Sequence, residues 1–147
     1  MAIRKSKRMQ LAWRLVFFAL LILISWAALR PTSGTSWFPG QDKVVHASAY
    51  AVLYFLGWLS FPGSAFRVYL FGGLVAFGVV IEVLQHFTGY RFLEFFDVVA
   101  NALGLVLGCF VVFACTRFLP GVVSVISGVQ NPCVSGLQQQ KEHSELD

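Results

Sequence analysis

Long apolar runs alternate with short polar segments along this chain, and four of the runs have the length of a membrane span. They are Leu11–Leu29, Val44–Phe61, Phe66–Phe87 and Phe95–Leu119. A helix needs about 20 apolar residues to cross a bilayer, whereas the strands of a membrane barrel alternate apolar and polar residues. The pattern therefore predicts an all-α membrane protein, a bundle of four transmembrane helices.

Polar side chains interrupt these runs at one end of the predicted bundle. If the runs alternate in direction, the start of the second, the end of the third and the start of the fourth lie at the same depth. The residues concerned are Asp42, Lys43, His46 and Tyr50, then Glu82, Gln85 and His86, and then Asp97 and Asn101. Ionisable groups are costly in hydrocarbon, so they usually face one another or a wet cavity. We expect them to form a single polar site.

Helical periodicity places the polar residues of each run on one face, and glycine continues that face inward. At about 100° per residue, Gly57 follows the polar face of the second run, Gly78 that of the third, and Gly104 and Gly108 that of the fourth. Small residues allow membrane helices to approach closely. The polar residues should therefore meet where the glycine faces meet.

The distribution of charge predicts the orientation of the bundle. Charged residues make up 12% of the chain, about half the share usual in soluble domains. With the N-terminus inside, eight of the 11 Lys and Arg residues fall on the cytoplasmic side, and Arg30, Lys43 and Arg91 fall outside. Both termini are therefore expected in the cytoplasm. The net charge of +4 indicates attraction to anionic lipid; without a nucleic-acid-binding motif, no nucleic acid partner is expected.

Three segments follow from this topology. Residues 1–10 form a basic cytoplasmic N-terminus, residues 11–119 one membrane domain, and residues 120–147 a cytoplasmic tail expected to be partly disordered. The basic N-terminus and the small residues Ser25 and Ala27 leave a cleaved signal peptide open as an alternative for the first run. The three cysteines show neither disulfide nor metal-ligand spacing.

The polar residues also form a pattern that resembles the VanZ-like membrane protein family. The motifs are Asp42-Lys43-x-x-His46-x-x-x-Tyr50, Glu82-x-x-Gln85, Arg91, and Asp97-x-x-Ala100-Asn101-x-x-Gly104, and the resemblance covers about three quarters of the chain. The namesake of that family lowers susceptibility to teicoplanin and accompanies a vancomycin-resistance gene cluster. The resemblance implies a multi-pass protein of the bacterial plasma membrane with a link to glycopeptide antibiotic resistance. It implies no particular reaction.

The first functional hypothesis is a site that binds or modifies an anionic lipid or lipid-linked headgroup at the outer leaflet. Acid–base chemistry is assigned to His46, Glu82 and Asp97, with Asp42 placed one turn from His46 to orient its imidazole. Substrate binding is assigned to Lys43 and Arg91, which suit a phosphate, and to Tyr50, Gln85 and Asn101. The site contains no activated Ser, Cys or Thr, so water or a substrate hydroxyl would attack. Whether the protein is an enzyme stays open.

Three alternatives remain. His46, Glu82 and Asp97 offer ligands for a divalent metal such as Zn, Mn or Ca, although nothing at sequence-local spacing supports one and no other cofactor is expected. A transporter is disfavoured because the polar groups lie at only one end of the spans. A non-catalytic scaffold of an envelope complex is the third alternative. Gln85 and Asn101, each taken alone, could simply join helices by interhelical hydrogen bonds. The oligomeric state is left open.

Overall fold

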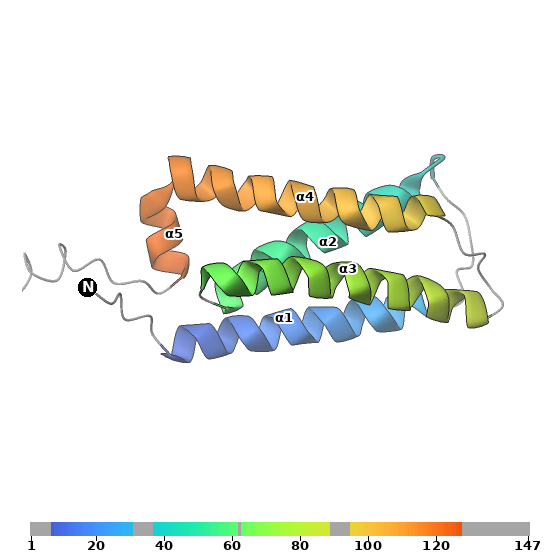
Figure 1. Ribbon diagram of the computed structural model, residues 1–147, viewed down its shortest axis with the longest axis horizontal. Coiled ribbons are helices and arrows are strands. Elements are labelled where there is room, and N and C mark those ends of the chain that lie inside the picture. Colours follow the sequence, from blue (N-terminus) through green and yellow to red (C-terminus); the bar gives the residue numbers. More distant parts are fainter. Residues whose placement is uncertain (1–6, 31–36, 62, 89–94, 128–147) are drawn as a thin grey trace, which may run out of the picture.

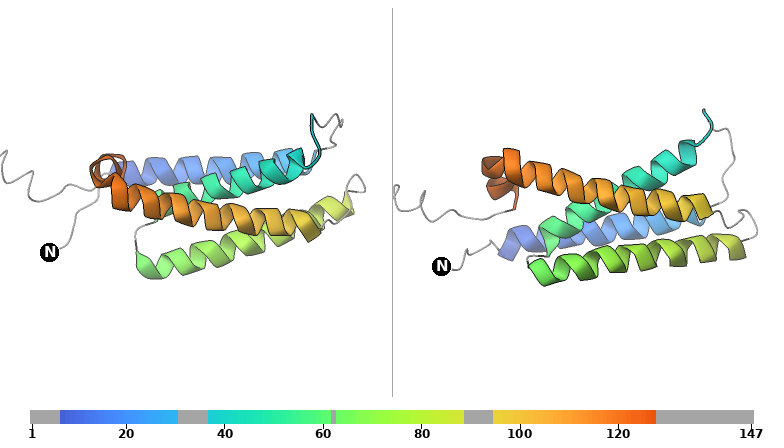
Figure 2. Two further views of the ribbon diagram at one scale, coloured as in Figure 1. Left: turned by 90° about the horizontal axis from the view of Figure 1, so that it is seen from above. Right: turned by 45° about the horizontal axis from the view of Figure 1, so that its top comes forward.

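The computed structural model describes residues 7–30, 37–61, 63–88 and 95–127, and these residues form five α-helices and no strand (Figure 1). The helices are α1 (Lys7–Ala28), α2 (Gln41–Ser60), α3 (Ser64–Phe87), α4 (Phe95–Phe118) and α5 (Pro120–Ile126). The four long helices extend between the same two ends of the bundle, and α2 crosses behind α4 at an angle to the other three (Figures 1 and 2). The all-helical prediction is confirmed for the described residues.

Three of the helices are long and apolar enough to cross a membrane. They are α1, the Ala65–Phe87 part of α3, and α4, with 22, 23 and 24 residues. Large apolar side chains such as Ile22, Val68 and Phe110 are exposed on these helices. Soluble monomers rarely expose apolar surface on this scale, whereas a surface that faces lipid has no reason to hide it. These helices are therefore the mark of a membrane protein.

Helix α2 is the central element of the bundle. It packs most extensively against α4 and next against α1, and it buries Tyr50, Leu53, Tyr54 and Leu59. Its polar first turns and its Tyr, Trp and Ser residues make it less apolar than its neighbours. The helix least suited by composition to face lipid is thus the one most covered by other helices.

Glycine allows α2 and α4 to approach closely. A Cβ atom added to Gly104 would overlap the backbone of Ala47, and one added to Gly108 would lie 2.9 Å from the Ala51 carbonyl oxygen. On the other side of α2, a Cβ atom at Gly57 would lie 2.7 Å from Leu70. The glycine faces expected from the sequence are therefore the faces along which the helices meet.

Helix α5 lies in the segment expected to be a tail. It begins at Pro120, whose missing N–H costs nothing in a first helical turn, and it turns back from α4 towards α1 (Figure 1). There the Trp13 indole nitrogen donates a 2.8 Å hydrogen bond to the Ile126 carbonyl oxygen. The first residues after α4 are thus a packed helix; residues 128–147 lie outside the described residues.

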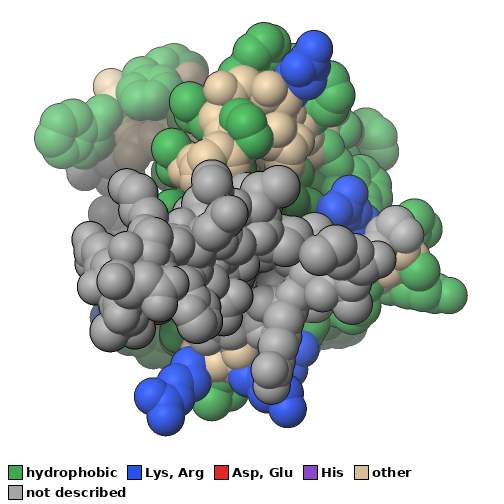
Figure 3. Space-filling model, turned by 90° about the vertical axis from the view of Figure 1, so that its left-hand side faces the viewer, with side chains coloured by type: hydrophobic (Ala, Val, Ile, Leu, Met, Phe, Trp, Pro, Cys, Tyr) green, Lys and Arg blue, Asp and Glu red, His purple; other side chains and the backbone are tan. Residues whose placement is uncertain are grey.

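The two ends of the bundle carry opposite charge. The end that includes the start of α1 and α3 and the end of α4 carries basic side chains, and Figure 3 shows no acidic one among those in view. The basic residues there are Lys7, Arg8, Arg14, Arg67 and Arg117. At the opposite end lie the acidic side chains of the described residues, Asp42, Glu82 and Asp97.

Candidate functional site

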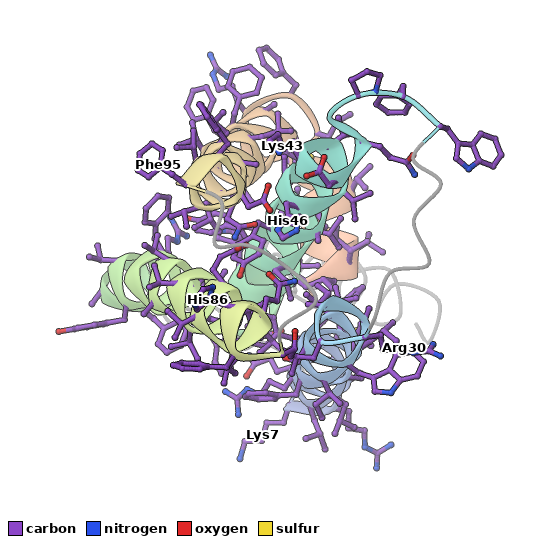
Figure 4. The ribbon with its side chains drawn as sticks, turned by 90° about the vertical axis from the view of Figure 1, so that its right-hand side faces the viewer. Lys7, Arg30, Lys43, His46, His86 and Phe95 are labelled. Atoms are coloured by element: carbon purple, nitrogen blue, oxygen red, sulfur yellow. The ribbon has the colours of Figure 1, made fainter. Side chains whose placement is uncertain are left out.

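Four polar side chains from three helices meet at the acidic end of the bundle, as the shared depth of their sequence positions predicts. His46 comes from the second turn of α2, Glu82 from the last turns of α3, and Asp97 and Asn101 from the first turns of α4. Figure 4 looks onto this end and shows the His46 side chain between these helices. We call His46, Glu82, Asp97 and Asn101 the polar centre.

The imidazole of His46 has one hydrogen-bond partner and one nearby carboxylate. Its Nδ1 atom lies 3.0 Å from Asn101 Oδ1 and 3.6 Å from Glu82 Oε1. An amide oxygen only accepts, so Nδ1 donates to Asn101, and a neutral ring then keeps its lone pair on Nε2. Asn101 thereby fixes the tautomer in which His46 can act as a base.

Two carboxylates are almost completely buried in the polar centre. The residues Glu82 and Asp97 are 2% and 4% exposed, and one ligand atom from each of His46, Glu82 and Asp97 can be chosen so that all three lie within 4.8 Å of one another. At that separation, two negative charges repel by about 3.5 kcal/mol with an effective dielectric constant of about 20. A positive charge nearby compensates for this repulsion.

Lys43 provides part of that compensation at the rim of the centre. Its Nζ lies 2.9 Å from Asp42 Oδ2 and 3.3 Å from Asp97 Oδ1, and its side chain is 34% exposed. The contact with Asp97 has ion-pair distance without hydrogen-bond alignment, since Asp97 Oδ1 has no hydrogen-bond partner among the described residues. The Lys43 ammonium group would therefore have to bind a substrate phosphate while it remains paired with the carboxylates of Asp42 and Asp97.

Asp42 has a different role from the one expected. The sequence placed it one turn from His46 as an orienting carboxylate, but it is Lys43 that Asp42 pairs with, and His46 is oriented by Asn101 and Glu82. Asp42 precedes the predicted span, and the hydrogen bond from the Lys43 ammonium holds the pKa of its carboxyl below the ordinary value. The Lys43 ammonium group reaches the Asp42 carboxylate directly because the two residues are neighbours in the sequence.

A second polar layer lies one helical turn deeper. Tyr50 follows His46 by one turn, Asn101 follows Asp97, and Gly78 precedes Glu82. A Cβ atom at Gly78 would lie 2.9 Å from the Tyr50 hydroxyl and 3.2 Å from Asn101 Nδ2. Both residues are more than nine-tenths buried, and these two atoms have no hydrogen-bond partner among the described residues. The two donor atoms approach the Gly78 backbone closely because glycine has no side chain there.

Gln85 shares the face of Glu82 but its amide is directed elsewhere. Its Nε2 donates a 2.9 Å hydrogen bond to the carbonyl oxygen of Ala28, the last residue of α1. This bond satisfies one of the carbonyl groups that a helix leaves unpaired at its C-terminus. Gln85 therefore joins α3 to α1 beside the polar centre, which is the structural role weighed for it in the sequence.

Two of the remaining polar residues lie apart from the centre, and one cannot be placed. His86 is exposed, as its angular offset from Glu82 predicts. Arg30 lies apart from His46 in Figure 4, with its guanidinium carbon 4.4 Å from the centre of the Trp26 ring. Arg91, assigned to substrate binding, lies outside the described residues. One contact could not be predicted from the sequence, namely the hydrogen bond from Gln85 to the Ala28 carbonyl oxygen, because every residue has a backbone carbonyl group.

No protein-family model, curated protein or solved structure matches the chain. Function is therefore inferred from the chemistry of the polar centre: an imidazole with a fixed tautomer beside two buried carboxylates, which can accept, hold and return a proton.

Proposed function

We propose that the protein is a multi-pass protein of the bacterial plasma membrane, similar to the VanZ-like family, that binds or modifies the headgroup of an anionic lipid or lipid-linked molecule. The observation that carries this proposal is the meeting of His46, Glu82 and Asp97 from three helices within 4.8 Å. Buried ionisable groups in membrane helices are expensive and usually functional.

The proposal includes four membrane crossings. Helix α2 has 20 residues, which corresponds to about 30 Å of helix, and it extends between the two ends of the bundle (Figure 2). With α2 as the fourth span, the basic end faces the cytoplasm and the polar centre faces the outer leaflet. Both termini are then cytoplasmic.

The chemistry follows from the groups present. The His46 ring takes a proton from water or from a substrate hydroxyl, and Glu82 or Asp97 in its protonated form returns one to the leaving group. Lys43 at the rim, together with Arg91 from the segment between α3 and α4, attracts the phosphate of the headgroup. The acyl chains remain among the exposed apolar side chains of α3 and α4.

A conduit through the bundle has less support. The side chains next to Tyr50 and Gly78 on the inner side include Leu53, Leu74 and Leu105, which belong to one hydrophobic cluster. Such a layer gives protons or ions no chain of hydrogen-bonding partners to follow. The polar centre therefore works from one side of the membrane.

The central test separates chemistry from helix packing. Glu82→Gln keeps the shape of the side chain and removes its charge, and His46→Ala removes the base. We expect both variants to reach normal abundance in the membrane, to fail to restore the lipid profile or teicoplanin susceptibility of a deletion strain, and His86→Ala, at an exposed position, to restore both. If Glu82→Gln and His46→Ala restore the phenotype fully, the protein is a scaffold and these residues are packing elements.

The lipid-headgroup part has its own test. Native mass spectrometry of the purified protein should show retained anionic lipid, and Lys43→Ala with Arg91→Ala should reduce the retained fraction at least several-fold. Retention that both substitutions leave unchanged, or no retained anionic lipid at all, contradicts a phosphate site at this rim.

The orientation can be measured independently. Reporter domains fused at either terminus should be active only when the reporter works in the cytoplasm, because eight of the 11 basic residues lie on that side of the proposed topology. Activity of an exported reporter at the C-terminus would place the polar centre at the inner face.

A further inference from the structure

The polar centre gathers negative charge. Among the described residues that contact one another at this end, the carboxylates of Asp42, Glu82 and Asp97 lie together with the ammonium group of Lys43. Glu82 and Asp97 are the two most buried of the three carboxylates, and a divalent cation between them offsets their mutual repulsion.

We propose that His46, Glu82 and Asp97 bind a divalent transition cation of the Zn²⁺ or Mn²⁺ class. One imidazole and two carboxylates suit these ions. Ca²⁺ takes six to eight oxygen ligands and Mg²⁺ keeps most of its waters, so neither makes use of an imidazole. Ligands from three different helices also explain why no metal-binding spacing is visible in the sequence.

The distances fit a site that closes slightly on its ion. Ligand atoms about 2.1 Å from a tetrahedral metal lie about 3.4 Å from one another. Because Nδ1 donates to Asn101, the free ligand atom of His46 is Nε2. One ring nitrogen of His46 and one oxygen from each of Glu82 and Asp97 lie within 4.8 Å of one another. Side-chain movements of about 1 Å bring all three into coordination distance.

The second polar layer independently points to a ligand above it. The hydroxyl of Tyr50 and Nδ2 of Asn101 are buried donors without a hydrogen-bond partner among the described residues, and both lie beside Gly78, one turn beneath Glu82. Buried donors are nearly always satisfied in native proteins. A water or substrate oxygen on the cation provides the missing acceptor, while Asn101 Oδ1 orients the His46 ring in the manner of an outer-sphere contact.

Three protein ligands leave one coordination position open, as in catalytic metal sites rather than structural ones. Where the proposed function holds, this position accepts a phosphate oxygen of the headgroup, and His46, Glu82 and Asp97 then act as ligands in place of the acid–base roles given above. This last step rests on the proposed function; the binding of the cation does not.

The direct experiment uses the full-length, tag-free protein in zwitterionic nanodiscs, stripped with chelator and titrated with Mn²⁺ alone or Zn²⁺ alone. We expect about one bound ion per chain after desalting. Pulsed electron paramagnetic resonance of the Mn²⁺-loaded protein should show coupling to an imidazole nitrogen. His46→Ala, Glu82→Gln and Asp97→Asn should each weaken binding at least tenfold, and His46→Ala should remove the nitrogen coupling.

His86→Ala is the matched control, because it deletes an exposed imidazole on the same helix as Glu82 and should leave both readouts unchanged. Glu82→Gln and Asp97→Asn keep side-chain shape, and size-exclusion profiles identify any variant that does not fold. The proposal is overturned if the wild-type protein retains no stoichiometric ion, if binding survives in folded Glu82→Gln and Asp97→Asn, or if His86→Ala removes it. A protein that binds the ion and retains no anionic lipid would keep the cation site and lose the proposed function.

Discussion

Replacing Gly104 with alanine should force α2 and α4 apart. The added Cβ atom would lie 2.8 Å from the Cα and 2.9 Å from the carbonyl carbon of Ala47, and closer still to its carbonyl oxygen. Carbon atoms in contact are normally about 3.5–4.0 Å apart, so the helices must separate by about 1 Å. The obstructing atoms are backbone atoms, which cannot rotate out of the way as the end of a side chain can.

The expected magnitude combines two opposing effects. Overpacking of this kind costs about 1–3 kcal/mol, and a gap of about 1 Å along the most extensive interface of the bundle weakens further dispersion contacts. Alanine regains about 1 kcal/mol of helix propensity relative to glycine. We expect a net destabilisation of about 2 kcal/mol. Gly72→Ala on α3, where an added Cβ meets nothing within 4 Å, should gain up to about 1 kcal/mol.

The assay compares the free energies of unfolding of Gly104→Ala and Gly72→Ala. Reversible unfolding in mixed micelles, followed by far-ultraviolet circular dichroism, should separate them by about 3 kcal/mol with wild type in between. Because Ala47 directly follows His46, Gly104→Ala should also move the imidazole away from Asp97 and impair the polar centre. Equal stability of Gly104→Ala and Gly72→Ala would refute the close approach of α2 and α4.

Three further outcomes follow from single contacts. Gly78→Ala fills the space beside the Tyr50 hydroxyl and should lower the activity or ion affinity of the polar centre more than it lowers stability, as activity and unfolding assays on the same sample would show. Gln85→Leu removes the hydrogen bond to the last carbonyl group of α1 and should cost about 1 kcal/mol in unfolding free energy. Trp13→Phe removes the hydrogen bond to the end of α5, and protease cleavage after α4 should become faster.

The sequence predicted the long helices because hydropathy reports the length of an apolar run directly. Helix α4 was expected at Phe95–Leu119 and extends over Phe95–Phe118. The first two helices begin earlier than predicted, at Lys7 and Gln41, because a helix continues into polar residues after its apolar run has ended. Helix α5 was not anticipated, since its 7 residues are too few to form a span or a clear periodicity.

The depth of the polar centre was also accessible from the sequence, whereas its pairing was not. Helical counting places His46, Glu82 and Asp97 at one level and on glycine-bearing faces. It gives no information on which acceptor a side chain chooses among several at that level. Lys43 pairs with the carboxylates of Asp42 and Asp97, and the Gln85 amide donates to a backbone carbonyl on α1. The contacts between helices could not be predicted because these partners become neighbours only when the helices pack.

The fastening of α1 has a consequence for the order in which the protein is assembled. Helix α1 buries only Phe17, and its two ends are held by hydrogen bonds from Trp13 to Ile126 and from Gln85 to Ala28. Both partners are synthesised long after α1 has left the ribosome. A chain arrested before residue 85 therefore has neither bond, and α1 is then held only by its packing against α2 and by the hydrogen bond from Arg14 to the Ser60 carbonyl oxygen. The hydrogen bonds at the two ends of α1 thus form only after α3 and α5 have been made.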